Sequence, residues 1–183
     1  QTLVLSDQLE VVGNYAFRGC AALSELSFKN VKTIGEKAFT KCTNLVSVTI
    51  PEGVVSIGQY AFQSCKALKA ITLPNSVTEL SPYLFSWCSA LEQVTLGSAL
   101  TQIGEYAFAN CEAMTQLTYS GNSNTAYPAV LPDTLRLVGP YAFSDCTALT
   151  GISLGKNVTA IGEHAFDKML ALTQVDLGES LLA

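Results

Sequence analysis

Residues 103–111, IGEYAFANC, bring together three side chains that can do chemistry: the carboxylate of Glu105, the phenol of Tyr106 and the thiol of Cys111. A cysteine nucleophile needs a base beside it that can take the thiol proton. A metal site needs several thiolates or imidazoles at short spacings, such as Cys-x2-Cys. Cys111 therefore has three possible chemical roles, as a nucleophile, a metal ligand or one half of a disulfide.

The positions of the other cysteines and of the histidine argue against these roles. Cys20 and Cys42 are the closest pair of cysteines in the sequence, yet they stand much further apart than the two of a Cys-x2-Cys motif. His164 is the only histidine, only Cys146 lies near it in the sequence, and no pair of carboxylates is singled out by its spacing. We therefore predict no catalytic residue, no metal ligand and no cofactor-binding residue in this chain, and we predict that it is not an enzyme.

Every cysteine instead occupies one position of a repeat. An aromatic residue marks each copy, at Phe17, Phe39, Phe62, Phe85, Phe108, Phe143 and Phe166. Except between Phe108 and Phe143, the interval is about 22 or 23 residues, which is a period typical of repeat proteins. Three positions after each phenylalanine stand Cys20, Cys42, Cys65, Cys88, Cys111 and Cys146, with Met169 in the seventh copy. Because methionine cannot form a disulfide and a buried thiol behaves as a small apolar group, we predict six reduced thiols in the core.

Each repeat also contains the pattern of a strand. Runs such as LVSVTI (45–50) and LKAITL (68–73) alternate apolar with polar residues and are rich in β-branched side chains, which favours a strand with one face inward. Proline or glycine then ends the run, and Ile-Gly leads to the next Ala-Phe pair. One unit of this size cannot bury its own apolar face, whereas stacked units share a continuous core. The sequence therefore predicts a parallel sheet in a curved solenoid.

The interval from Phe108 to Phe143 is longer because of an insertion. It equals one ordinary unit plus the segment YSGNSNTAYPAV at positions 119–130. The glycine, asparagine, serine and threonine content of this segment predicts a surface loop. The chain begins inside one unit and stops at LGESLLA, partway through another. We therefore expect residues 1–183 to form a single solenoid of about seven units, each of about 22–23 residues, that is a fragment of a longer protein.

The unit L-x-x-V-x-L-P-x-x-V-x-x-I-G-x-x-A-F-x-x-C resembles the BspA-like leucine-rich repeats, and the resemblance covers nearly the whole chain outside the insertion. It implies an α/β repeat solenoid, a right-handed superhelix with a parallel β-sheet on one face and short helical turns or loops on the other. Proteins of this family occur mainly as surface or secreted proteins of bacteria and some parasitic protists, and they are associated with adhesion and protein binding. The resemblance therefore implies an extracellular or cell-surface location.

Two columns of side chains are expected to face solvent. The first lies on the strands and is small and polar: Ser27, Thr49, Thr72, Thr95, Thr118, Ser153 and Asp176. Threonines stacked on neighbouring strands can hydrogen-bond to one another, and they can equally face a ligand. Both roles are open for this column.

The second column lies two positions before each phenylalanine: Tyr15, Lys37, Tyr60, Tyr83, Tyr106, Tyr141 and His164. Because lysine and histidine replace tyrosine here, the tip of each side chain must reach solvent. Aromatic residues with a polar end are favoured at binding sites, but tyrosine also packs well against a neighbouring repeat, so both roles are open. The candidate protein-binding residues are Tyr15, Tyr60, Tyr83, Tyr106 and Tyr141, together with Tyr127 in the insertion.

Charge and hydropathy exclude two classes of partner. The net charge is −5 and the lysines and arginines are scattered singly, so we predict no nucleic-acid partner. The apolar runs are far shorter than the roughly 20 residues of a membrane-spanning helix, so we predict no membrane insertion within this segment.

The preferred hypothesis is a non-catalytic protein–protein interaction or adhesion module that binds host surface or matrix proteins. The alternative is a structural spacer or scaffold that displays another domain.

Overall fold

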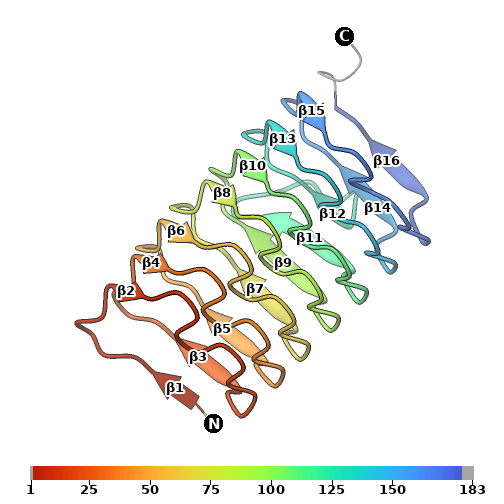
Figure 1. Ribbon diagram of the computed structural model, residues 1–183. Helices are drawn as coiled ribbons and strands as arrows, with labels where there is room; N and C mark the ends of the chain where they lie inside the picture. The colour runs from red at the N-terminus through yellow and green to blue at the C-terminus, as the bar shows by residue number, and fades with distance from the viewer. Residues whose placement is uncertain (1, 179–183) are drawn as a thin grey trace.

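The chain folds as a parallel β-solenoid of about eight turns in a computed structural model that describes residues 2–178. Each turn of the solenoid is called a coil below. Figure 1 shows the coils stacked along one axis, with the first strand, β1 (Thr2–Val4), and the last strand, β16 (Gln174–Asp176), at opposite ends. The partial unit expected at the C-terminus lies outside the described residues from position 179 onward.

The main sheet contains nine parallel strands. Between β1 and β16 these are β3 (Glu25–Ser27), β5 (Ser47–Thr49), β7 (Ala70–Thr72), β9 (Gln93–Leu96), β11 (Gln116–Tyr119), β12 (Ala129–Val130) and β14 (Gly151–Ser153). Equivalent residues of successive repeats are paired, as Val48 is with Ile71. In β7, Ile71 is buried and both of its neighbours are exposed, so the alternation seen in the sequence does place one face inward.

Each coil also contributes a short strand to a second row. These strands form a three-stranded sheet of β2 (Val11–Val12), β4 (Thr33–Ile34) and β6 (Ser56–Ile57), and a four-stranded sheet of β8 (Glu79–Leu80), β10 (Gln102–Ile103), β13 (Leu137–Val138) and β15 (Ala160–Ile161). A glycine follows this strand in most coils, with Ser81 in its place after β8, and at several of these positions the coils approach closely. A Cβ atom on Gly58 would lie 2.5 Å from the backbone nitrogen of Glu36, and one on Gly104 would lie 2.5 Å from the carbonyl oxygen of Leu80.

Of the short helical turns or loops that the resemblance implied opposite the main sheet, the helical turns are absent, since residues 2–178 contain no helix, and the segments around each Ala-Phe pair are non-helical turns. In the third coil, Tyr60 and Ser64 have left-handed backbone angles, with φ of 60° and 58°. The N–H groups of Tyr60, Phe62 and Ser64 donate to the carbonyls of Pro82, Leu84 and Ser86 in the next coil, at 3.1, 3.1 and 2.9 Å. A helix directs its N–H groups to carbonyls of its own segment, so these inter-coil bonds replace it.

Stacked phenylalanines fill the core beside these turns. Phe39, Phe62, Phe85, Phe108 and Phe143 are all 0% exposed. Successive ring centroids, from Phe17 to Phe166, lie 5.2–5.8 Å apart. We call this set the phenylalanine column.

Five of the six cysteines are buried next to the phenylalanine column, as the repeat predicted. Each buried thiol donates to the carbonyl oxygen of a phenylalanine in the preceding coil; for Cys88 the acceptor is Phe62, at 3.2 Å. The expectation of six core thiols was wrong for Cys20, which is exposed because it belongs to the first described coil. Burial raises the pKa of Cys88 and of Cys146 to about 12, so both thiols stay protonated at neutral pH.

The insertion does not form only a surface loop. Tyr119 ends β11, and Ala129–Val130 form β12, which lies between β11 and β14 in the main sheet (Figure 1). Ala129 pairs with Leu117 on one side and with Ile152 on the other. Phe108 and Phe143 nevertheless stack directly, at 5.4 Å. The insertion therefore adds one strand to the main sheet, but no extra Ala-Phe turn lies between those of Phe108 and Phe143. Only residues 120–128 form the loop.

Candidate functional site

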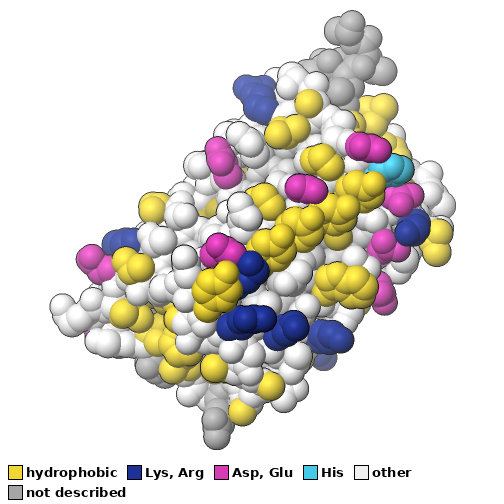
Figure 2. Space-filling view, viewed as in Figure 1, with side chains coloured by type: hydrophobic (Ala, Val, Ile, Leu, Met, Phe, Trp, Pro, Cys, Tyr) yellow, Lys and Arg dark blue, Asp and Glu magenta, His cyan; other side chains and the backbone are white. Residues whose placement is uncertain are grey.

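Four tyrosines and the histidine form a continuous stack of rings along the turns. We call Tyr60, Tyr83, Tyr106, Tyr141 and His164 the tyrosine ladder. Successive ring centroids lie 4.6, 4.7, 4.6 and 4.8 Å apart, and neighbouring ring planes differ by 2–20°. In Figure 2 a continuous yellow stripe crosses the visible face and ends at the cyan histidine. The spacing of the ladder equals the usual separation of about 4.8 Å between strands of a sheet.

The backbone of each turn sets this spacing. The N–H groups of Tyr83, Tyr106 and Tyr141 donate to carbonyls one coil further on, at 2.8–2.9 Å. All residues of the ladder have left-handed φ values of 52–60°. That conformation costs about 1–2 kcal/mol for a residue with a Cβ atom, and the inter-coil hydrogen bonds offset the cost. Because the backbone alone fixes the position, side chains other than tyrosine can occupy it.

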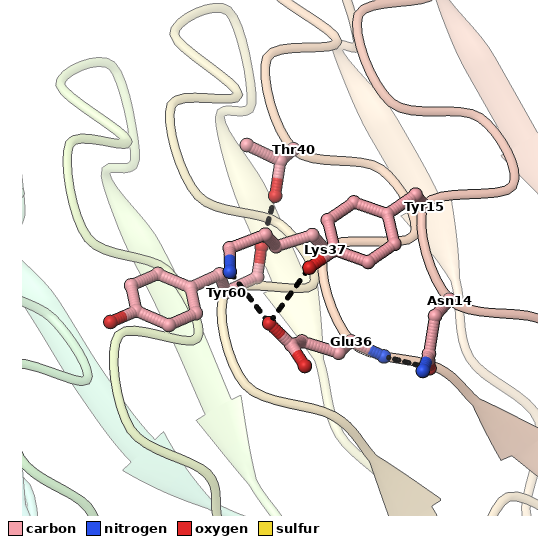
Figure 3. A network of polar contacts seen from close by, with 6 residues as sticks. All are labelled: Asn14, Tyr15, Glu36, Lys37, Thr40 and Tyr60. Carbon is pink, nitrogen blue, oxygen red and sulfur yellow. Dashed lines mark hydrogen bonds and ion pairs between the residues drawn. The ribbon is translucent and has the colours of Figure 1, made fainter.

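Lys37 occupies this position between Tyr15 and the ladder. Its Nζ atom lies 4.6 Å from the ring centroid of Tyr60 and 5.5 Å from that of Tyr15 (Figure 3). Glu36 Oε1 accepts hydrogen bonds from Lys37 Nζ at 2.6 Å and from the Tyr15 hydroxyl at 3.3 Å. These bonds raise the pKa of Lys37 and lower the pKa of Glu36, so both groups stay charged. Lys37 therefore continues the column as a cation held against aromatic rings.

Two further hydrogen bonds fix the ends of this arrangement. Asn14 Oδ1 accepts from the backbone N–H of Glu36 at 2.8 Å, and the Thr40 hydroxyl donates to the carbonyl oxygen of Tyr60 at 2.6 Å (Figure 3). Both link one coil to its neighbour. The charged end of the column is therefore joined by hydrogen bonds to the coils on either side.

The four ladder tyrosines are half-buried, while Tyr15 is 46% exposed. Both faces of each inner ring are covered by neighbouring rings, so the ladder presents ring edges and hydroxyl groups to solvent. Burial, followed by the nearby Glu105 carboxylate, raises the pKa of Tyr83. Burial, followed by Tyr141 and Glu105, raises the pKa of Tyr106. The phenols of Tyr83 and Tyr106 therefore keep their protons. The hydroxyl groups of the ladder form a row of hydrogen-bonding groups at regular spacing.

Among the candidate residues predicted from the sequence, only Tyr127 lies away from this column. It is half-buried and belongs to the loop of the insertion. The loop and β11 enclose an open groove of about 520 Å³, which we call the insertion groove. Its lining includes Gln116, Thr118, Asn122, Asn124, Tyr127 and Pro128. Sequence reasoning identified the loop as irregular but did not identify the groove, because the groove requires β12 to pair with the sheet.

Asparagine side chains hold the loop in shape. Asn122 Nδ2 donates to the Thr118 hydroxyl oxygen at 3.0 Å, and Asn122 Oδ1 accepts from the N–H of Asn124 at 2.9 Å. Asn124 Oδ1 accepts in turn from the N–H of Ala126 at 2.9 Å. These asparagines were the signal in the sequence that could have indicated an ordered loop rather than a flexible one.

The polar column on the strands faces outward as predicted at Thr49 and Thr72, which are exposed, but the expectation was wrong for Ser153, which is buried. Neither threonine makes a side-chain hydrogen bond within residues 2–178, so threonine-to-threonine bonds across the strands do not form there. Ser153 is buried and donates to Asp176 Oδ2 at 3.0 Å. The exposed part of this column therefore consists of Ser27, Thr49 and Thr72 on β3, β5 and β7.

In the described part of the chain, the titratable groups considered for catalysis or metal binding lie apart from one another. No group of three or more histidine, cysteine or acidic side chains is placed to hold a metal ion among residues 2–178. His164 Nε2 lies 3.2 Å from Glu163 Oε1, whereas the Cys146 thiol donates to the carbonyl of Phe108 at 3.3 Å. These two groups thus have separate partners. Residues 2–178 also contain no helix long and apolar enough to span a membrane.

Solved bacterial structures share this architecture. The leucine-rich repeat protein of T. pallidum is 26% identical, with a TM-score of 0.80 over 94% of this chain and 78% of that chain. A leucine-rich repeat protein from Eubacterium ventriosum is 26% identical, with a TM-score of 0.77 over 97% of this chain and 43% of that chain. A leucine-rich cell surface protein from Faecalibacterium prausnitzii is 24% identical, with a TM-score of 0.60 over 94% of this chain and 59% of that chain, which shows the fold alone.

A family model agrees with the structural likeness. The model of the BspA type leucine-rich repeat region matches residues 10–129 and 122–183, with six copies. No curated protein matches the chain. The family match agrees with the repeated phenylalanine, cysteine and Ile-Gly positions and with the solenoid that they build. The chain therefore belongs to the BspA type leucine-rich repeat family.

Proposed function

We propose that this solenoid is a non-enzymatic protein-binding and adhesion module of a secreted or cell-surface protein, and that the tyrosine ladder with Tyr15 and Lys37 is its binding stripe. Leucine-rich repeat proteins are typically protein-interaction modules. The similar protein from Faecalibacterium prausnitzii is described as a cell surface protein, which supports the location. Host surface or matrix proteins are the partners that this location favours.

The observation that supports the stripe most strongly is the rigid stack of half-exposed tyrosines at 4.6–4.7 Å intervals. Tyrosine is enriched at interfaces because it offers apolar area and a hydrogen-bonding tip. Rings already held by their neighbours lose little side-chain entropy when a partner binds. Lys37 pairs with Glu36 near one end of the stripe and His164 with Glu163 at the other, and the Glu105 carboxylate lies near Tyr83 and Tyr106 between them.

The test uses a panel of purified host-surface and matrix proteins immobilised for biolayer interferometry. The variant Tyr60→Ser/Tyr83→Ser/Tyr106→Ser is expected to bind at least about tenfold more weakly than the wild type to any panel member that the wild type captures. The matched control is Thr49→Ala/Thr72→Ala/Gln93→Ala on the exposed face of the main sheet, which is expected to bind as the wild type does. Equal losses in both variants, or an unchanged tyrosine variant, would contradict the proposal.

The alternative function, a spacer or scaffold that displays another domain, has one observation in its favour. The outer face of β5 and β7 carries only small uncharged side chains, Ser47, Thr49, Ala70 and Thr72. A passive spacer needs a soluble, inert surface of this kind. If no panel member binds the wild type with a dissociation constant below about 1 mM, which corresponds to roughly 4 kcal/mol, the spacer becomes the better explanation.

A further inference from the structure

The insertion groove has a fixed shape. Three hydrogen bonds of the Asn122 and Asn124 side chains hold the loop over β11. Pro128 anchors the other end of the loop where Gly151 has no side chain: a Cβ atom on Gly151 would lie only 3.1 Å from Pro128 Cδ. The volume of the insertion groove, about 520 Å³, lies within the usual range of roughly 300–1,000 Å³ for small-ligand sites. The groove is therefore present before any ligand binds.

None of the residues that line the insertion groove is charged. The polar groups are amides and hydroxyls, which both donate and accept hydrogen bonds. The aromatic ring of Tyr127 and the ring of Pro128 supply the apolar part. This lining lacks the cationic groups that bind phosphates or acidic sugars, and it lacks a deep apolar pocket for a hydrophobic side chain.

Several of these polar groups still have unused hydrogen-bonding capacity. The Gln116 amide makes no side-chain hydrogen bond within residues 2–178, and neither does the amide of Gln93, its register partner on β9. The Thr118 hydroxyl accepts from Asn122 and keeps its own proton to donate. Asn124 uses its oxygen to accept from Ala126, which leaves its NH₂ group for another acceptor. The free groups are thus both donors and acceptors, arranged over the sheet and the loop.

We propose that the insertion groove binds a neutral oligosaccharide. A sugar hydroxyl is both a donor and an acceptor, as are the amide and hydroxyl groups that line the groove. The C–H face of a sugar ring is apolar and packs against an aromatic ring such as that of Tyr127. Gln116, Thr118 and Asn124 bind the hydroxyl groups, and the open side of the groove lets a longer chain continue over β9 past Gln93. This glycan site is distinct from the tyrosine ladder.

The experiment titrates ¹⁵N-labelled protein with linear hexasaccharides of glucose, mannose, xylose and N-acetylglucosamine, and with two charged probes, a heparin hexasaccharide and an oligogalacturonate. We expect at least one neutral hexasaccharide to shift the backbone amide signals of residues 116–130. The dissociation constant should stay the same within about twofold between low and high salt, because no ion pair forms. Tyr127→Ala should weaken binding by at least about tenfold.

Two further variants keep the proposal falsifiable if Tyr127→Ala alters the loop. Gln116→Ala removes an exposed amide on β11 that does not hold the loop, and it should weaken binding by about three- to tenfold. Tyr83→Ala, in the tyrosine ladder, should leave glycan binding unchanged, so the two proposals can fail separately. The proposal is overturned if no neutral hexasaccharide shifts residues 116–130, if only charged probes or proteins bind there, or if neither Tyr127→Ala nor Gln116→Ala weakens binding.

Discussion

The phenylalanine column and the tyrosine ladder stand two positions apart on the same turns, yet their environments differ. Ring centroids are 5.2–5.8 Å apart in the first and 4.6–4.8 Å apart in the second. Phe85 is 0% exposed and Tyr83 is half-exposed. Lys37 stands in line with the tyrosines, whereas a charge among the phenylalanines would lose its hydration without compensation. The stacking of rings in both columns is therefore a consequence of the repeating backbone. The columns differ in solvent exposure, which makes the phenylalanines part of the core and the tyrosines a candidate binding stripe.

The largest expected effect comes from shortening one side chain in each column. Phe85→Ala should lower the free energy of unfolding by about 3–5 kcal/mol, because it leaves a cavity in a closed core. Tyr83→Ala should lower it by only about 1–2 kcal/mol, since the lost contacts are mainly those with the two neighbouring rings. Urea unfolding followed by circular dichroism measures both values. Tyr83→Phe, which keeps the ring, is the control and should change stability by less than about 0.5 kcal/mol.

Equal costs for Phe85→Ala and Tyr83→Ala would remove the distinction between the two columns. The tyrosine ladder would then be part of the core, and the proposed binding stripe would lose its main support.

The second prediction concerns pH and the thiols beside the phenylalanine column. Burial raises the pKa of Cys88 to about 12, from an ordinary value of 9.0. Above about pH 9 the unfolded chain loses this proton while the folded chain keeps it, so stability must fall as pH rises from 9 toward 12. Each such thiol contributes a slope of about 1.4 kcal/mol per pH unit. Cys88→Ala should make the slope shallower by that amount.

Urea midpoints measured between pH 8 and 11 give these slopes. Met169→Ala shortens the buried, non-ionisable side chain at the equivalent position of the last copy and serves as the matched control, with the slope of the wild type expected. A Cys88→Ala slope equal to that of the wild type would mean that the Cys88 thiol ionises equally easily in the folded and unfolded chains.

The smallest expected effect is that glycine is more stabilising than alanine at position 83 but less stabilising than alanine at position 85. Tyr83 has a φ of 59°, so Tyr83→Gly should be more stable than Tyr83→Ala by about 0.5–1 kcal/mol, because glycine adopts the left-handed conformation without strain. Phe85 is not among the residues with positive φ, so Phe85→Gly should be less stable than Phe85→Ala by a similar amount. Thermal melts of the four variants test the inversion. The same order at both positions would show that the turn backbone adapts to its side chain.

Several features could be predicted from the repeat because they depend on spacing alone. The inward position of Ile71, the buried place of Cys88 and the alignment of Tyr83 with Tyr106 follow once equivalent residues are stacked. The helical turns could not be excluded in this way. Ala-Phe-x-x-Cys has no glycine to signal a left-handed residue in most copies, and its hydrogen bonds go to a neighbouring coil rather than to residues nearby in sequence.

The insertion shows a second limit of prediction from the sequence, namely that a local pattern does not reveal which strands will pair. Its composition predicted a loop, but the pairing of Ala129 with Leu117 and Ile152 depends on β11 and β14, which the rest of the solenoid holds on either side of it. A strand as short as Ala129–Val130 carries too little local preference to be specified by its own sequence. The insertion groove, which Tyr127 and Gln116 both line, exists only because of that pairing.

By itself the sequence determined the solenoid, the phenylalanine and cysteine columns and the outward column of tyrosines, because a regular repeat period brings each position beside its own copy. The tertiary structure alone decided how the turns are built, where Lys37 meets Tyr60, and that residues 119–130 close a groove over β11. These features depend on hydrogen bonds and contacts between coils, and their geometry is set only when neighbouring coils are in place.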